Sequence, residues 1–213
     1  MALEKNLFFN NEFAEKYDES VQKQKWYGAE ILFGMIYEYI KPKEKILDIG
    51  IGTGLSASAF HHTGLEVYGL DYSNEMLELC KQKNIAVELR QFDLNNTPLP
   101  YQSNFFNHIS ANAILYFLAE LDALFFEISR IMKVKGIWAF IVEENNSQQH
   151  PEIIEKPPGK NGLITYQHSK NYLLDLAKQN GFHVLKKIEF VAENFQMEGK
   201  AVLFQLYVTE KQV

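Results

Sequence analysis

The chain has 213 residues, of which 46% are hydrophobic, and a formal net charge of −6. This length fits one α/β domain with a short extension, and the apolar fraction is sufficient for a full core. Arginine occurs only at positions 90 and 130, and the sequence contains no cluster of basic residues, which argues against a nucleic-acid partner.

The rest of the composition bears on compartment and partners. The single cysteine, Cys80, excludes an intrachain disulfide and suits a reducing environment. The first residues lack the apolar core of a signal peptide, and no apolar run approaches the ~20 residues that a membrane helix needs. We therefore expect a cytoplasmic protein that acts as a monomer or homodimer, without a membrane partner.

The N-terminal part of the chain is expected to be helical. Aromatic residues are frequent in the first 20 positions, and from 26 to 40 apolar residues recur at helical spacing until Pro42 ends the pattern. Phe13, Tyr17 and Trp26 fit two interpretations. They either pack in the core or belong to a lid that covers a ligand.

Residues 46–49 have the pattern of a short, buried strand, and Gly50, Gly52 and Gly54 follow it in a tight turn before a helix. Glycine permits positive φ and the close approach of a ligand, and a helix N-terminus offers free N–H groups. Dinucleotide-binding enzymes use G-x-G-x-x-G, whereas position 55 here is leucine. The spacing therefore favours a nucleotide cradle of another kind.

Carboxylates stand at the ends of three successive expected strands, as Asp48, Asp71 and Asp93. Open α/β sheets bind ligands at the carboxyl ends of their strands, so these side chains are expected near one site. Asp71 can accept both hydroxyls of a ribose; its alternative role as a helix N-cap is one that Ser73 can fill. The alternative for Asp93 is a turn residue. The three strands are expected at 45–49, 65–70 and 86–92.

The run Asp48-x-Gly50-x-Gly52-x-Gly54 resembles the first motif of the class I S-adenosylmethionine-dependent methyltransferases. The resemblance covers essentially the whole chain and is strongest over residues 45–142. It implies S-adenosyl-L-methionine as the cofactor and S-adenosyl-L-homocysteine as the product. The implied cofactor-binding residues are Tyr17, Asp48, Gly50, Gly52, Thr53, Gly54, Asp71, Tyr72, Met76, Asp93, Leu94 and Asn112.

Some of these residues have specific implied roles. Residues 13–18 resemble the segment ahead of the first motif in small-molecule methyltransferases, in which a tyrosine approaches the methionine end of the cofactor. On this interpretation Tyr17 takes that place. Tyr72 and Met76 flank the adenine, and Asp93 accepts the adenine amino hydrogens beside Leu94.

The second half of the chain completes the expected fold. The segment after the fourth strand contains Asn112 and Tyr116 and resembles the family loop that leads into the acceptor pocket. The polar stretch 143–165 is expected to be irregular and to lie over the site, where such loops carry specificity. The remaining expected elements are strands at 105–110, 137–142, 182–191 and 201–209, and helices at 121–132 and 169–179.

The resemblance implies an α/β, Rossmann-like methyltransferase fold. Its sheet is seven-stranded and mostly parallel, in the order 3-2-1-4-5-7-6 with strand 7 antiparallel, and helices cover both faces. We expect one methyltransferase domain over 1–213. It divides into an N-terminal helical lid (1–40), a cofactor-binding core (41–142) and a substrate loop with closing strands (143–213).

Methyl transfer from a sulfonium is an in-line displacement, for which the protein mainly supplies alignment. The clustered carboxylates of the metal-dependent members, the Asn-Pro-Pro-aromatic motif of the amino-methylating nucleic-acid enzymes and the Pro-Cys pair of the cytosine C5 enzymes are not found. We therefore expect a metal-independent enzyme that methylates O, N or C of a small molecule. The chain resembles the broad ubiquinone-biosynthesis-like superfamily.

The candidates for contact with the acceptor are Trp26, Tyr116, Glu143 and His150, and the last three, together with His168, are candidate general bases. Each also fits as a core, loop or surface residue. The segments 8–30 and 143–165 are expected to close over the methyl group, and acidic residues in the second favour a neutral or cationic acceptor. Two other classes stay open: a non-enzymatic module that binds S-adenosylmethionine or S-adenosylhomocysteine, and a nicotinamide oxidoreductase.

Overall fold

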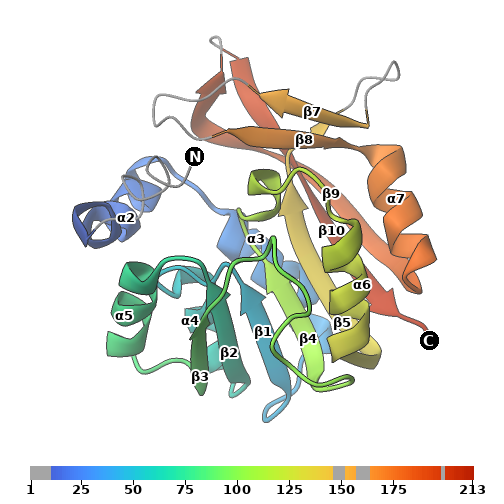
Figure 1. Cartoon of the computed structure of the whole chain (residues 1–213). Helices are drawn as coiled ribbons and strands as arrows, with labels where there is room; N and C mark the ends of the chain where they lie inside the picture. Colours follow the sequence, from blue (N-terminus) through green and yellow to red (C-terminus); the bar gives the residue numbers. More distant parts are fainter. Residues whose placement is uncertain (1–10, 146–151, 157–163, 198–199) are drawn as a thin grey trace.

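The computed structural model describes residues 11–145, 152–156, 164–197 and 200–213. A seven-stranded sheet has helices on both faces, and a small three-stranded sheet lies above one end of it (Figure 1). The order of the large sheet is β3-β2-β1-β4-β5-β10-β9. Its strands are β1 (Lys45–Ile49), β2 (Glu66–Asp71), β3 (Glu88–Gln91), β4 (Phe106–Ala111), β5 (Met132–Val142), β9 (Phe182–Met197) and β10 (Lys200–Lys211).

The predicted strand order is confirmed. β1 pairs in parallel with β2 and with β4, and β4 pairs in parallel with β5. β10 is antiparallel to both of its neighbours, β5 and β9. The strand order reverses between β1 and β4, and ligands bind to open α/β sheets at the carboxyl ends of the strands beside such a reversal.

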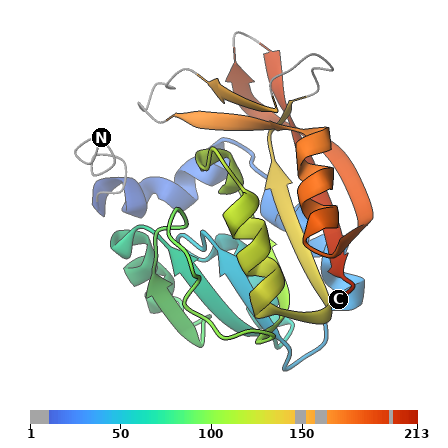
Figure 2. The same cartoon turned by 45° about the vertical axis from the view of Figure 1, so that its right-hand side comes forward.

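Helices on the two faces of the sheet enclose two hydrophobic cores, because alternate residues of a strand point to opposite faces. In β5, Ile137 and Ile141 join the core beneath α3, α4 and α5, while Trp138 and Phe140 join the core beneath α6 and α7 (Figure 2). The helices are α2 (Asn11–Lys23), α3 (Gly28–Ile36), α4 (Leu55–His62), α5 (Asn74–Gln82), α6 (Asp122–Ile131) and α7 (Lys170–Gln179), with short 3-10 helices η1 (Tyr37–Tyr39) and η2 (Leu115–Phe117).

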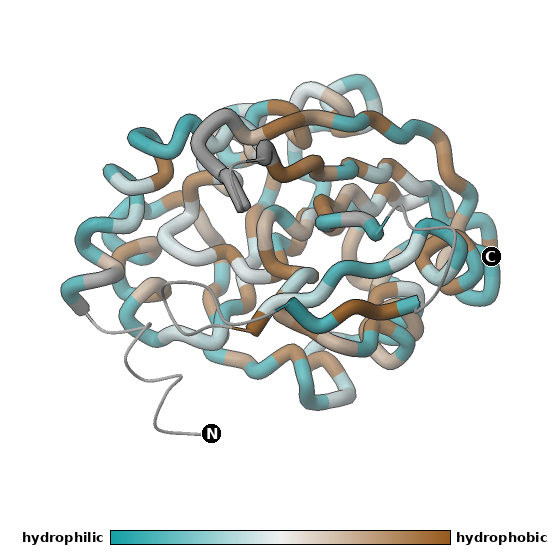
Figure 3. Tube along the Cα trace, turned by 90° about the horizontal axis from the view of Figure 1, so that it is seen from above, coloured by the Kyte–Doolittle hydropathy of each residue, from teal (hydrophilic) through white to brown (hydrophobic). Residues whose placement is uncertain are grey.

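Figure 3 shows hydrophobic segments concentrated in the middle of the molecule and hydrophilic turns at its edges. Within the described ranges, no helix is both long and apolar enough to cross a membrane.

The N-terminal part differs in detail from the expectation. The helix predicted over 26–40 begins at Gly28 and ends as η1. Lys25, at the junction of α2 and α3, has a positive φ of 51°, which breaks the helical path, and Trp26 is drawn into the core. Helix α2 lies outside the large sheet, on the same side of the molecule as α5 (Figure 1).

The described residues of the stretch 143–165 are mostly in strands, contrary to the prediction of an irregular loop. They contribute strands β6 (Glu144–Asn145), β7 (Ile153–Lys156) and the start of β8 (Thr165–Ser169), which form the small sheet in the order β6-β8-β7. β7 and β8 are antiparallel, and Ile153 stands opposite the buried His168. The polar composition was misleading because Lys156 of β7 and Gln167 of β8 both donate hydrogen bonds to Glu143, which directly precedes β6.

The strands of the second half are longer than predicted. β5 begins at Met132 instead of residue 137, and a register shift between Phe106 and His108 in β4 accommodates the extra residues. β9 runs to Met197 and β10 begins at Lys200, so most of the residues between the strands expected at 182–191 and 201–209 are also strand. The extension of β5 arises from its pairing with β4, where Met132 stands opposite Phe106. The extra residues of β9 and β10 pair with each other, as Met197 does with Lys200.

Candidate functional site

The turn after β1 uses its glycines for two different purposes. Gly50, Gly52 and Gly54 all have positive φ, at 70°, 56° and 85°. An added Cβ at Gly50 or Gly54 would lie only 2.6 Å from a side-chain carbon of Ile114 or Ile85, whereas at Gly52 the nearest atom would be 4.0 Å away. Gly50 and Gly54 are therefore packed against the protein, and Gly52 faces open space in which a ligand can approach the backbone.

Asp71, at the end of β2, is tied to this turn. Its carboxylate accepts hydrogen bonds from the backbone N–H of Gly52 at 2.8 Å and of Ser73 at 2.9 Å. Burial raises the pKa of Asp71, although these backbone bonds favour the charged form. Ser73 caps α5 by accepting from the Met76 N–H at 3.2 Å, as predicted. Asp71 is thus placed beside the open Gly52, with acceptor capacity left for a ligand.

Asp48 occupies a different position. Its side chain is only 1% exposed, in the strand beneath the turn, and it accepts a hydrogen bond of 2.8 Å from the Ser110 hydroxyl on β4. Burial raises the pKa of Asp48 to about 7, and the charge of Asp71 adds to the effect. Asp48 therefore supports the glycine turn from within the sheet. It is not among the residues that line the cavity beside the turn.

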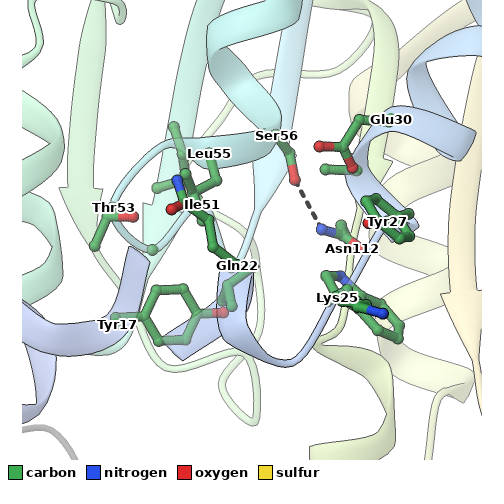
Figure 4. Close-up of a pocket in the computed structure, with 15 residues that line it drawn as sticks. Tyr17, Gln22, Lys25, Tyr27, Glu30, Ile51, Thr53, Leu55, Ser56 and Asn112 are labelled. Atoms are coloured by element: carbon green, nitrogen blue, oxygen red, sulfur yellow. Dashed lines mark hydrogen bonds between the residues drawn. The ribbon is translucent and has the colours of Figure 1, made fainter. Parts of the chain in front are cut away.

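A cavity of about 170 Å³ separates the N-terminal segment from the glycine turn (Figure 4). Asn112, at the end of β4, donates through Nδ2 to the Ser56 hydroxyl at 2.8 Å. Its Oδ1 is buried without a hydrogen-bond partner in the described part of the chain. The lining residues are Tyr17, Val21, Gln22, Lys25, Trp26, Tyr27, Ala29, Glu30, Gly50, Ile51, Gly52, Thr53, Leu55, Ser56 and Asn112.

These features test whether the site fits a ligand with a nucleoside and an amino-acid end. Asn112 Oδ1 can accept a hydrogen bond from a ligand. The N-terminus of α4 has no side-chain cap. Free N–H groups at a helix start suit a carboxylate. With the open backbone at Gly52 and the acceptor capacity of Asp71, the residues present fit S-adenosylmethionine.

The residues expected around adenine lie along the ends of β2 and β3, outside this cavity. Tyr72 is 39% exposed, whereas Met76 is 4% exposed. Asp93 Oδ1 accepts from both the backbone and side-chain nitrogens of Asn95, at 3.0 and 2.8 Å, as a turn residue does. Leu94 packs against the nearby core. Their role toward adenine stays a prediction.

Tyr17 comes to the glycine turn from helix α2. It faces Thr53 and Ile51 across the cavity in Figure 4. Burial and the charges of Asp71 and Asp18 raise the pKa of Tyr17 to about 12, so its hydroxyl keeps its proton. The neighbouring Asp18, which the sequence did not single out, accepts hydrogen bonds from Thr53 Oγ1 and Lys83 Nζ.

Trp26 fits both of the interpretations drawn from the sequence. It is buried with its ring centroid 4.8 Å from that of Phe204 and 5.8 Å from that of Phe190, and it also lines the cavity. Tyr116 packs against Phe117 at 4.6 Å and lies 6.5 Å from Phe204. Burial raises the pKa of Tyr116, and the charges of Tyr17 and Glu143 add to the effect.

Two of the candidate bases are engaged in structural contacts. Both carboxylate oxygens of Glu143 accept from Lys156 Nζ, at 2.7 and 2.6 Å, and one also accepts from Gln167 at 2.6 Å. His168 is fully buried, and its Nε2 lies 3.1 Å from the carbonyl oxygen of Ala119. Burial lowers the pKa of His168. These contacts attach the small sheet to the rest of the molecule, and they argue against either residue as a general base.

Some expectations fall outside the described residues. They include His150, the first three residues of the segment 8–30 and much of the stretch 143–165. Among the residues described, no group of three or more His, Cys, Asp or Glu side chains could hold a metal ion.

The class of this domain is also found by comparison with known proteins. Residues 47–140 match the family model described as a methyltransferase domain. They run from within β1 to within β5 and include the glycine turn and all three strand-end aspartates. This part of the chain is thus similar to methyltransferase domains, and the strand order of its sheet is that of the Rossmann-like fold expected from the sequence.

The chain is also similar in sequence to curated methyltransferases, among them the following two. Demethylmenaquinone methyltransferase of Bacillus mycoides is 36% identical over 104 residues, which cover 46% of this chain and 44% of the relative. Malonyl-[acyl-carrier protein] O-methyltransferase of Legionella pneumophila is 25% identical over 137 residues, which cover 60% of this chain and 45% of the relative. The chain thus spans somewhat less than half of the curated relatives it matches.

A solved structure extends the likeness to most of the fold. Geranyl diphosphate C-methyltransferase from Streptomyces coelicolor, in complex with Mg²⁺, geranyl diphosphate and S-adenosyl-L-homocysteine, has a TM-score of 0.70. It shares 17% sequence identity, and the match covers 94% of this chain and 84% of that one. At this identity the likeness concerns the fold.

Proposed function

We propose that this protein is an S-adenosylmethionine-dependent methyltransferase that transfers a methyl group to O, N or C of a small-molecule acceptor. One observation carries the proposal: the glycine turn of a methyltransferase domain leaves Gly52 open and holds Asp71 beside it through a 2.8 Å backbone bond. A carboxylate and an accessible backbone at the carboxyl edge of the sheet suit a nucleoside.

We infer the orientation of the cofactor from the polar groups on the two sides of the glycine turn. Asp71 would accept the ribose hydroxyls, and Tyr72, Met76, Asp93 and Leu94 would surround the adenine. The amino-acid end would lie toward Asn112, whose unpartnered Oδ1 suits an ammonium group. The bound cofactor supplies a methyl group activated on a sulfonium. The chain supplies alignment and excludes water.

The acceptor is proposed to lie near Trp26 and Tyr116, next to Asn112. Apolar area from aromatic side chains and a few polar groups are what small-molecule pockets usually provide. The acidic character expected of segment 143–165 is reduced, because Glu143 pairs with Lys156. We therefore favour an uncharged acceptor. The named relatives act on three different acceptors, so their names do not identify this one.

Ligand-induced thermal stabilisation tests the cofactor. A ligand at 100 times its Kd adds about 2.7 kcal/mol to stability. We expect S-adenosylmethionine and S-adenosylhomocysteine to raise Tm and NAD to leave it unchanged. The reverse result would favour the oxidoreductase alternative. A labelled-methyl screen over small phenols, amines and acids then tests turnover, and binding without transfer to any of them would favour the non-enzymatic module.

The same proposal includes the organisation of the chain. The chain would form one domain with three parts: a lid over 1–40, a cofactor-binding core over 41–142 and an acceptor-covering part over 143–213. The protein would act in the cytoplasm as a monomer or homodimer. Light scattering during size-exclusion chromatography measures the oligomeric state. Fractionation of cells that produce the protein measures its location.

A further inference from the structure

Asp18 joins three parts of the molecule. It lies on helix α2, one residue after Tyr17. Thr53 Oγ1, in the glycine turn, donates a hydrogen bond to Asp18 Oδ1, and Lys83 Nζ, at the C-terminal cap of α5, donates to Asp18 Oδ2 at 2.7 Å. One carboxylate thereby connects the N-terminal helix to the turn that the proposed cofactor would occupy and to the helix after β2.

The two other charged pairs described on α2 do not connect this helix to another element. Lys16 pairs with Glu12 and Lys23 pairs with Glu19, both within the helix and both with side chains more than half exposed. Such pairs contribute little to stability. The bond from Thr53 is of another kind, because Thr53 is buried and its partner is charged, and charge-assisted hydrogen bonds are roughly twice as strong as neutral ones.

The chain between α2 and α3 is suited to act as a hinge. Lys25 has a φ of 51°, in the left-handed region that non-glycine residues rarely adopt. Trp26, the next residue, is fixed in the core against Phe204 and Phe190. Hinge motions use a few such terminal residues to absorb the backbone change. Helix α2 can therefore move about a fixed Trp26 when its contacts through Asp18 are released.

We propose that Asp18 is a positioning residue, which holds the Tyr17-bearing helix over the glycine turn through Thr53 and Lys83 and so slows release of the cofactor product without touching it. This inference rests on the proposed function, because it assumes that S-adenosylhomocysteine binds beside Gly52. Tyr17 then acts as the contact and Asp18 as the group that keeps it in place.

The two bonds are expected to contribute unequally. The Asp18 and Lys83 side chains are 36% and 32% exposed, so their ion pair is weakened by water and salt. Asp18→Asn keeps an oxygen that can accept from Thr53, whereas Asp18→Ala removes both bonds. We therefore expect release to be fastest for Asp18→Ala, intermediate for Asp18→Asn and close to wild type for Lys83→Gln.

The experiment measures S-adenosylhomocysteine dissociation by stopped-flow fluorescence and hydrogen exchange over residues 11–23. Glu19→Gln is the matched control, since it removes a carboxylate from the next position of the same helix. We expect Asp18→Ala to speed dissociation about tenfold, the size of one charged hydrogen bond, and to raise exchange in α2. Glu19→Gln should leave both unchanged, and circular dichroism identifies a variant that fails to fold.

Dissociation that is equal in Asp18→Ala and wild type would overturn the inference, and so would equal effects of Asp18→Ala and Glu19→Gln. If the wild-type protein binds no S-adenosylhomocysteine, the proposed function fails. Exchange in the ligand-free proteins still tests the contact itself. Equal protection of residues 11–23 in wild type and Asp18→Ala would refute it.

Discussion

The two sides of the candidate site are built in contrasting ways. On one side, the glycine turn is held by contacts close in sequence or between adjacent strands, such as the bonds of Asp71 to Gly52 and Ser73. On the other, side-chain contacts through Asp18 connect α2 to the turn and to α5, and contacts through Glu143 and His168 attach the small sheet. The first arrangement gives a rigid cofactor edge. The second gives parts that can be displaced without unfolding the core.

The largest effect is expected where the small sheet meets β5. Lys156→Met would leave the buried Glu143 carboxylate without its cation, and breaking a buried pair from one side costs about 3–5 kcal/mol. We expect loss of protection in β7 and β8, measured by hydrogen exchange, with the large sheet unaffected. The double variant Glu143→Gln, Lys156→Met should recover most of the loss. Uniform destabilisation of the whole chain would contradict the idea that the small sheet can be displaced without unfolding the large one.

Gly54→Ala tests the rigid side. The new methyl group would lie 2.6 Å from Ile85 and 2.8 Å from Cys80 Sγ, at a φ of 85°. Strain and overpacking together should cost about 2–4 kcal/mol in the free energy of unfolding, measured in urea. Gly34→Ala is the control, because nothing lies within 4 Å of an added Cβ in helix α3. That variant should be neutral or slightly stabilising.

Asp71→Ala separates binding from folding. A hydrogen bond from a ribose hydroxyl to a charged group contributes about 1.5–3 kcal/mol, so S-adenosylhomocysteine affinity should fall about 10- to 100-fold by calorimetry. Asp93→Ala should have a smaller effect, because Asp93 lies in a turn outside the cavity. Equal affinities of Asp71→Ala and wild type would contradict the ribose assignment.

A different kind of effect, on the pH dependence of stability, is expected from the buried Asp48. Its pKa in the folded protein is about 7, above the 3.8 of the unfolded chain, so the folded state binds the extra proton between these values. The stabilisation that comes from this proton is fully present below about pH 4 and is lost as the pH rises through 7. The free energy of unfolding should fall by up to about 1.4 kcal/mol per pH unit. Asp48→Asn should remove that slope from urea unfolding measured between pH 5 and 8. The same slope in wild type and variant would contradict it.

The sequence alone determined the alternation of buried strands with helices and the character of the glycine turn, because both follow from local rules. Three closely spaced glycines occupy a turn in which every one has positive φ. The capping role of Ser73 was predictable for the same reason, since an N-cap depends on residues only three apart. The order of the large sheet was implied by the resemblance of the glycine turn to a family motif, and the structure has the same order.

Only the tertiary structure decided what the distant residues do. Glu143 looked like a candidate base in a polar loop, until folding brought Lys156 and Gln167 onto its oxygens. Asp18 stood unremarked beside Tyr17, and its contacts with Thr53 and Lys83 bridge 35 and 65 positions. The residues next to a carboxylate in the sequence do not show whether its side chain is free or paired in the folded protein. Its partner is set by the packing of elements far apart in the chain, which no local spacing encodes.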